Sequence, residues 1–313
     1  MATVAVSRSC NQLQPTISVR RRAWVLLIVA SLVLGGCLST RFIYNQIDWL
    51  MVWYISDVFS LEKEQKQELR KVVNRNLDWV RTQQLPEYAQ LLRELEASAS
   101  DGTLAVDQLQ GQAETMLGLF DTVLRQMIPD MASFLGALSD QQVADFVAKS
   151  EVKNEELWEE YAGDTLEARQ ARRTKSAVKN IQRFTGKLDD QQKELIAGHM
   201  ARMYDNSQEW MQGRRQWQAD FQALVLERPP REELEQRLEE IVLNPNYTDT
   251  DTYRQQVEAN TVVVFEMLVD LTTTLSDKQR DRMSERLLGF AEDFEALAQD
   301  EKLNQKMAER EAA

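Results

Sequence analysis

Apolar residues recur at helical spacing along most of the chain, and this pattern predicts a nearly all-helical protein. The clearest example is a seam in which such positions follow each other at alternating steps of four and three residues. Its members are Ile196, Met200, Met203, Ser207, Trp210, Arg214, Trp217, Phe221 and Leu224. Ser207 and Arg214 are polar breaks in this seam. A seam with tryptophans and polar breaks favours an antiparallel partner helix in the same chain over a long parallel dimer.

Four short phrases mark expected helix starts. Each has a leucine, then Ser, Asp or Glu, and a glutamine three residues after that: Leu61–Gln65, Leu138–Gln142, Leu188–Gln192 and Leu275–Gln279. We expect Ser139, Asp189 and Ser276 to be N-caps, because the glutamine that follows each can complete a capping box. The intervals of 77, 50 and 87 residues do not fit a solenoid of fixed period. The fold class predicted is therefore all-α, with long antiparallel helical hairpins of unequal length forming an elongated bundle.

Proline and glycine set the other expected boundaries. Pro86 is predicted to divide one helix into 61–84 and 86–97, and Pro129 to start a new helix after 105–127. Gly163 is a weak point in an expected helix over 139–184, which Gly186 closes. Further helices are predicted over 189–227, 231–243, 249–273 and 276–298, with loops at 101–102, 228–230 and 244–246.

The segment from Arg41 to Ser60 is densely aromatic, and two interpretations of it remain open. It contains Phe42, Tyr44, Trp49, Trp53, Tyr54 and Phe59, interrupted by Asp48 and Asp57. An amphipathic helix at the headgroup level of a membrane would suit its Trp and Tyr side chains. We favour a core helix, because apolar residues occur nearly all round from Leu50 to Ile55.

The N-terminal segment has the order of a bacterial lipoprotein signal. Three arginines, Arg20 to Arg22, precede an apolar run from Ala23 to Leu34. The run is closed by a lipobox that consists of Leu34, Gly35, Gly36 and Cys37. The run is about a dozen residues long, whereas a bilayer span needs about 20, so a cleaved signal is favoured over an uncleaved anchor. Residues 1–36 are then the signal peptide, and Cys37 carries the covalent lipid. By resemblance to Gram-negative lipoproteins, Leu38 after the cysteine implies export to the outer membrane.

This cleavage defines the remaining organisation. Residues 37–60 form the lipidated N-terminus and an aromatic membrane-proximal helix, 61–299 a helical periplasmic domain, and 300–313 a charged tail expected to fray. Because residues 1–36 contain four arginines and no acid, their loss moves the formal charge from −13 to −17. A surface this acidic is repelled by phosphates, so no nucleic acid partner is expected. Cys10 leaves with the signal, so the mature domain has neither a disulfide nor a free thiol.

Few residues are candidates for chemistry. His199 is the single histidine, which excludes multi-histidine metal sites. Together with Met200, Met203 and Met211 it could form a soft Cu(I) site, but helix packing is the preferred interpretation because two of these methionines lie in the seam. As a general base, His199 has no partner in an identifiable motif. We therefore predict no catalytic residues, no metal and no cofactor other than the lipid on Cys37.

One basic stripe stands out in the acidic chain. Its members lie at helical spacing: Arg169, Arg172, Arg173, Lys175, Lys179 and Arg183. Pairing with an internal acidic helix such as 232–240 is the favoured interpretation. The alternative is a docking strip for an acidic client, an anionic glycan or lipid headgroups. If exposed, this stripe, with Trp210 and Trp217, is the predicted binding surface.

Two resemblances bear on function. The Leu138–Gln142 phrase and its relatives resemble the Leu-Thr-x-x-Gln motif of Spy and CpxP, small all-helical periplasmic chaperones that act without nucleotide, although Ser, Asp or Glu stands here in place of Thr. The lipobox, the run from Tyr44 to Leu50, and Trp53-Tyr54-Ile55 with Asp57 resemble a family of uncharacterised Gram-negative helical lipoproteins. That second resemblance covers most of the mature chain but implies no activity.

Three functions follow as hypotheses. The first is an outer-membrane lipoprotein, held to the membrane by its lipid anchor, that acts as a non-enzymatic binding or scaffolding module for an envelope protein partner. The second is an ATP-independent periplasmic chaperone or envelope-stress protein, which should carry a contiguous, concave apolar surface. The third is a hydrolase of unknown type. The sequence leaves the partner and the oligomeric state open.

Overall fold

A computed structural model describes residues 40–243 and 250–300 of the chain, and the described part is helical throughout with no strand. This confirms the all-α fold class. The helices are α2 (Thr40–Val58), α3 (Lys63–Trp79), the π-helical turn η1 (Val80–Gln84), α4 (Leu85–Ser100), α5 (Val106–Gly136), α6 (Asp140–Tyr161), α7 (Leu166–Thr185), α8 (Asp190–Arg202), α9 (Ser207–Glu227), α10 (Arg231–Val242), α11 (Asp251–Thr274) and α12 (Asp277–Ala298). None of these described helices is long and apolar enough to cross a membrane. The lipobox, Cys37 and the C-terminal tail from residue 301 lie outside the described residues.

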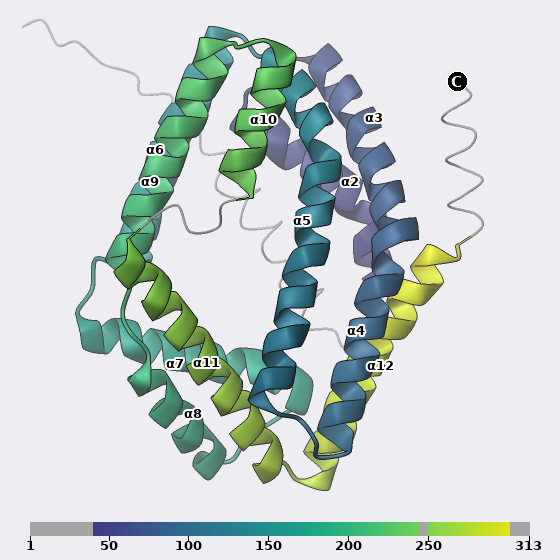
Figure 1. The fold of residues 1–313 in the computed structure, drawn as a ribbon, viewed down its shortest axis with the longest axis vertical. Coiled ribbons are helices and arrows are strands. Elements are labelled where there is room, and N and C mark those ends of the chain that lie inside the picture. Colours follow the sequence, from purple (N-terminus) through teal and green to yellow (C-terminus); the bar gives the residue numbers. More distant parts are fainter. Residues whose placement is uncertain (1–39, 244–249, 301–313) are drawn as a thin grey trace, which may run out of the picture.

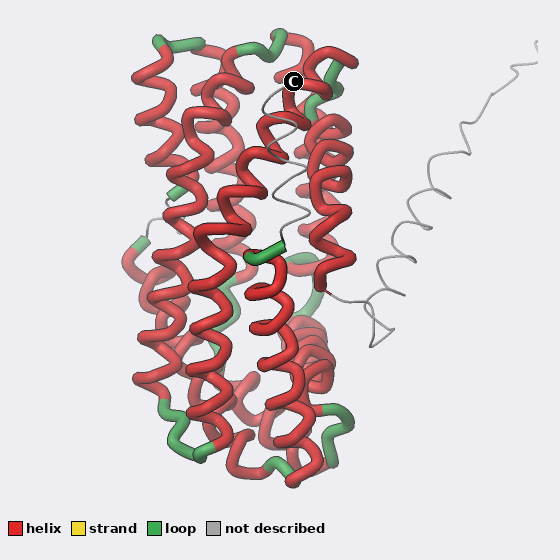
Figure 2. The backbone as a smooth tube through the Cα atoms, turned by 90° about the vertical axis from the view of Figure 1, so that its right-hand side faces the viewer, coloured by secondary structure: helices red, strands yellow, loops and turns green. Residues whose placement is uncertain are grey.

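The helices form an elongated bundle whose apolar core is divided between its two ends (Figures 1 and 2). Near the upper end in Figure 1, α2, α3, α5, α6, α9 and α10 share one cluster, in which Leu138, Leu224 and Leu238 are almost completely buried. Near the lower end, α7, α8 and α11 share a second cluster around Leu188 and Ile196. The long path through α3, η1 and α4 runs the length of the molecule, and α12 lies antiparallel along α4.

The four Leu-to-Gln phrases do begin helices, and they also meet in pairs. Ser139, Asp189 and Ser276 cap α6, α8 and α12, each accepting the backbone N–H of the glutamine three residues on. At the first phrase, Gln65 accepts the backbone N–H of Glu62 at 3.0 Å. The glutamine amides then hydrogen-bond to each other across the turns, as two pairs. One pair lies at each end of the bundle.

Each pair is reciprocal. Gln192 and Gln279 exchange two amide hydrogen bonds, of 3.0 and 2.9 Å. Each also donates to the backbone carbonyl just before the other's leucine: Gln192 to Thr274 at 3.1 Å and Gln279 to Lys187 at 2.9 Å. The same four hydrogen bonds recur at the other end of the bundle between Gln65 and Gln142, with Ala137 and Ser60 as carbonyl acceptors. The phrases thus clamp two helical turns together at each end.

The boundary predicted at Pro86 is present, since α4 begins at Leu85, but the chain stays helical there and passes from α3 to α4 through a π-helical turn. The N–H of Leu85 bonds to the carbonyl of Val80, five residues back, so the turn is wider than an α-helical one. Pro86 follows in the first turn of α4, where a missing N–H costs little. Arg81, in this turn, is 1% exposed and donates to the carbonyl of Leu297 at 3.0 Å. It therefore satisfies a carbonyl at the C-terminal end of α12.

Pro129, in contrast, does not start a helix as predicted, because it lies inside α5. A proline in a helix interior costs about 3 kcal/mol. Ile128 and Leu135, on the same stretch of α5, are both buried in the upper cluster. Burying two such side chains contributes roughly 3 to 6 kcal/mol. Packing therefore offsets the proline and keeps the helix continuous.

The expected helix over 189–227 is also interrupted, at Met203 to Asn206, which separate α8 from α9. The predicted seam is consequently not one surface. Ile196 and Met200 pack in the lower cluster, whereas Phe221 and Leu224 pack in the upper one. The helix expected over 139–184 does break next to Gly163, as predicted, between Tyr161 and Leu166.

Candidate functional site

An apolar cavity of about 490 Å³ opens in the upper half of the bundle. It lies among α2, α3, α5, α6 and α9, with Val242 of α10 at its edge. Its lining is mostly aliphatic and aromatic; Met51, Ile55, Val72, Val73, Leu77, Met131 and Leu135 are representative. Pockets of about 300 to 1,000 Å³ with predominantly apolar walls are typical ligand sites. The cavity is therefore a candidate ligand-binding site.

A chain of packed rings holds the upper part of this cavity. Phe59, which follows α2, stacks on Phe146 of α6 with ring centroids 5.0 Å apart. Phe146 meets Phe221 of α9 edge-on at 5.4 Å, and Phe221 stacks on Trp217 at 5.3 Å. The indole N–H of Trp217 donates to the carbonyl of Ile241 at 3.0 Å. Because these rings lock each other's orientation, this wall is preformed.

Trp217, which the sequence placed on a possible binding surface, thus lines the cavity. Arg214, one turn earlier on α9, lines it too. Its Nε donates to the side-chain oxygen of Asn154 at 2.9 Å, and Asn154, which is fully buried, donates to Gln218 at 2.6 Å. The polar break in the seam is therefore a cationic group held against a mostly apolar site.

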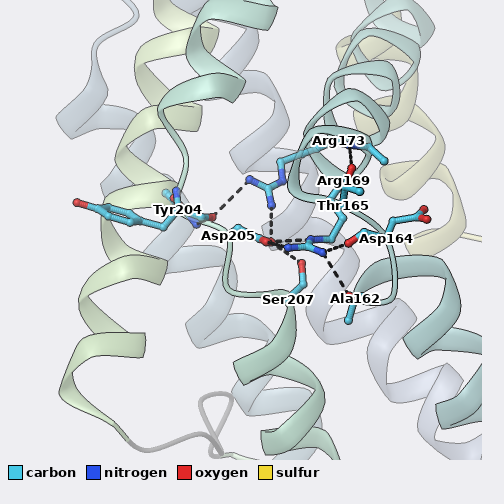
Figure 3. A network of polar contacts seen from close by, with 10 residues as sticks. Ala162, Asp164, Thr165, Arg169, Arg173, Tyr204, Asp205 and Ser207 are labelled. Atoms are coloured by element: carbon cyan, nitrogen blue, oxygen red, sulfur yellow. Dashed lines mark hydrogen bonds and ion pairs between the residues drawn. The ribbon is translucent and has the colours of Figure 1, made fainter.

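The basic stripe on α7 is divided between internal pairing, which Figure 3 shows, and the surface. Arg169 and Arg173 both reach Asp205, in the break between α8 and α9, and Asp205 also accepts from the hydroxyl of Ser207 at 2.8 Å. Arg169 further donates to the carbonyls of Ala162 and Asp164. The network therefore joins the turn before α7 to the turn before α9.

Electrostatics and backbone hydrogen bonds both stabilise this network. Burial by itself raises the pKa of Asp205, but hydrogen bonds from Arg169 and Ser207 outweigh burial and hold that pKa below its usual value. Asn260 of α11 accepts the N–H of Tyr204 at 2.8 Å and donates to its carbonyl at 3.0 Å. The break between α8 and α9 is thus held by side chains from two other helices.

The acidic partners of the stripe differ from those favoured by sequence. Arg172 pairs with Asp164 at 2.5 Å, next to the Asp205 network. In the helix expected to supply the acids, α10, Glu239 pairs instead with Arg125 and Glu235 with Arg231. The remaining members of the stripe, Lys175, Lys179 and Arg183, are exposed. Trp210 is 39% exposed and contacts Tyr161 edge-on at 6.2 Å.

His199 has an acidic neighbour that the sequence did not indicate. Its Nε2 lies 2.9 Å from a carboxylate oxygen of Asp270, and its Nδ1 lies 3.2 Å from the guanidinium of Arg202. Because a guanidinium only donates, Nδ1 accepts and Nε2 carries the hydrogen toward Asp270. Nε2 thus links α8 to α11, whereas the Nδ1 contact lies within α8. Met200 is buried in the lower cluster, in keeping with the packing interpretation of the methionines.

The aromatic segment is a helix with one buried side and one exposed aromatic side. On one side of α2, Val52 is buried and Met51 and Ile55 pack on the upper cluster, as expected of a core helix. On the other side, Trp49 and Trp53 are 48% and 44% exposed and lie with near-parallel rings 6.4 Å apart. Beyond them Tyr54 is 63% exposed.

Comparison with known proteins places the chain in a family without assigning a function. Residues 57–254 match the model of a family of unknown function, DUF6279. The chain belongs to this family. No curated protein and no solved structure matches the chain. The matched range extends from the end of α2 to the start of α11, and so includes most of the cavity lining.

Several features of these sites were missed from the sequence, although one left a signal. Asp205, Asn206 and Ser207 form a run of helix-capping residues, with Glu209 in the first turn of α9. This run could have indicated a helix start at residue 207. The pairing of the glutamines and the position of Arg214 in the cavity had no such local signal.

Proposed function

We propose that this protein is an outer-membrane lipoprotein of the periplasmic face that acts as a non-enzymatic binding module, with the apolar cavity as its binding site. The cavity is the observation that carries the proposal. A cavity of about 490 Å³ bordered by locked aromatic rings exposes apolar surface that a purely structural bundle would fill with side chains. Such a site fits an apolar ligand and requires no catalytic group.

The lipid anchor supplies the location in this proposal. The lipobox places the acylated residue at Cys37, three residues before the start of α2. Exposed Trp49, Trp53 and Tyr54 on that helix suit a position near lipid headgroups, where amphipathic rings are stable. The family model gives no activity that would favour an enzyme.

Two experiments test the two parts of the proposal. Cys37→Ser should abolish labelling by an alkyne-tagged palmitate and leave an unprocessed precursor; normal labelling of that variant would refute the anchor. For the cavity, a photo-crosslinking amino acid is placed at Val72, which lines it, and at Lys179 on the surface as the control. Illumination of intact cells should give adducts at position 72. If adducts form only at position 179, the cavity is not the binding site.

The same cavity favours a second candidate, an ATP-independent chaperone, because a concave apolar surface is what such a protein needs. The chaperone should suppress aggregation of an unfolded client at equimolar amounts. It should lose that effect when Ser150→Phe introduces a bulky ring among the cavity-lining residues. Absence of suppression by the unaltered chain would exclude this candidate and leave the binding module intact.

A further inference from the structure

Charge is distributed unevenly around the cavity. Its cationic lining residues lie on two neighbouring helices: Lys149 and Lys153 on α6 and Arg214 on α9. Its acidic lining residue, Asp130 on α5, is already neutralised by Arg75 at 2.5 Å and accepts from Asn76 at 2.7 Å. In a chain with a formal charge of −13, this wall is therefore locally positive.

Arg214 is the most distinctive of these cations. It is partly buried, its side-chain partner is the neutral amide of Asn154, and no carboxylate of the described residues forms an ion pair with it. Lys153, in contrast, pairs with Glu156 at 2.9 Å, and Lys149 donates to the hydroxyl of Ser60 at 3.0 Å. A half-buried guanidinium is normally paired, because its desolvation is otherwise uncompensated. The charge of Arg214 is thus available to an anion that enters the cavity.

The position of Arg214 relative to the aromatic rings defines the shape of the ligand. Arg214, Trp217 and Phe221 are spaced by three and four residues, so they share one face of α9. Seven residues of helix rise by about 10 Å. An anionic group at Arg214 would therefore continue into an apolar chain along Trp217 and Phe221.

The other polar groups of the lining argue against a polypeptide ligand. Asn76 donates to the carbonyl of Val72 and to Asp130, and Gln218 accepts from Asn154. A peptide in this cavity would bring a backbone N–H and C=O with every residue, and each would need a partner. An alkyl chain brings none. The volume of about 490 Å³ suits one long chain and excludes a folded domain.

We propose that the cavity binds a single-chain anionic amphiphile, of the class of long-chain fatty acids, with its acidic head at Arg214 and its alkyl chain along the rings of α6 and α9. This inference rests on the proposed function, because it assigns a ligand class to that same cavity. The contribution of Arg214 is a charge-assisted hydrogen bond to the head group. Loss of such a bond lowers affinity by about tenfold or more.

Two photoactivatable probes with the same chain test the inference: diazirine-bearing hexadecanoic acid and the matching hexadecanol. They are added to isolated membranes that contain the full chain, and labelled peptides are located by mass spectrometry. We expect the acid to label peptides of α6 and α9, and the alcohol to label them about tenfold less. Arg214→Gln should reduce labelling by the acid to the level of the alcohol, and Arg214→Lys should retain most of it.

The matched control is Arg215→Gln, which removes the same charge from the next residue. Arg215 is exposed and lies over the ring of Trp158, 5.9 Å from its centroid, and does not line the cavity. Its loss should leave labelling by the acid unchanged. Circular dichroism of each variant verifies that the fold is retained.

The outcomes separate the ligand class from the proposed function. Equal labelling of the cavity by acid and alcohol, insensitive to Arg214→Gln, overturns the anionic head but keeps the cavity as a binding site. Labelling by neither probe, with polypeptide adducts at position 72, overturns the amphiphile and keeps the binding module. If neither probe nor a cellular molecule reaches the cavity, both proposals fail.

Discussion

The reciprocal pair of Gln192 and Gln279 predicts a measurable coupling between residues 87 positions apart. Gln192 is 2% exposed, and its amide bonds to the backbone N–H of Asp189, the carbonyl of Thr274 and both polar atoms of the Gln279 amide. Gln192→Ala removes all four hydrogen bonds, each with a net contribution of about 0.5 to 1.5 kcal/mol. Water reaches part of the site, so we expect a loss of about 2 to 3 kcal/mol in the free energy of unfolding.

The double variant separates the mutual bonds from the others. Gln279→Ala should cost about 2 kcal/mol, because Gln279 also donates to the carbonyl of Lys187. Since both single variants break the same two amide bonds, the double variant should cost about 1 to 2 kcal/mol less than the sum of the two. Urea unfolding of the full chain in mild detergent, followed by circular dichroism, measures each value.

Two controls make this cycle specific. Gln191→Ala, at the exposed neighbouring position, should change stability by less than about 0.5 kcal/mol. Gln65→Ala combined with Gln192→Ala should be additive within about 0.5 kcal/mol, since they lie in the first turns of α3 and α8, which begin at opposite ends of the bundle in Figure 1. Additive losses in the Gln192 and Gln279 cycle would show that the amides do not bond to each other, and would refute the clamp.

Three further predictions concern the turns and α5. Asp205→Asn should cost about 3 kcal/mol at pH 7, because it leaves Arg169 without its carboxylate. The folded-state pKa of Asp205 is depressed, so the contribution of this carboxylate to stability is present above about pH 4 and lost below. The stability deficit of the variant, measured by urea unfolding, should therefore shrink as pH falls from 5 to 3, and a constant deficit would contradict this. Gly186→Ala should lower the melting temperature more than Gly102→Ala. Both glycines have positive φ, +81° and +68°, but a Cβ at Gly186 would also approach the side chain of Arg282 to 3.2 Å. Equal losses in melting temperature would be inconsistent with that contact. Pro129→Ala should stabilise the chain by about 1 to 2 kcal/mol in urea, since α5 already continues through this position, and destabilisation would show that the proline is required there.

Local patterns were sufficient to predict the helical class and most helix starts. The N-caps at Ser139, Asp189 and Ser276 depend on hydrogen bonds within three residues, which the sequence displays directly. The weak point near Gly163 is likewise local. One prediction failed where a local rule met a competing contact, since Pro129 continues its helix because buried neighbours offset the lost hydrogen bond. The break at 203–206 was missed for another reason: the seam pattern was followed across a local signal, the capping run from Asp205 to Ser207.

The sequence by itself determined an all-α chain with capped helices, and it predicts a lipobox ending at Cys37. Tertiary structure alone decided which glutamines pair, which arginines are neutralised and where the apolar cavity lies. The reason is distance along the chain. Capping and helical periodicity act within a few residues, whereas Arg214 and Asn154, or Gln192 and Gln279, meet only after segments of 60 and 87 residues have folded against each other.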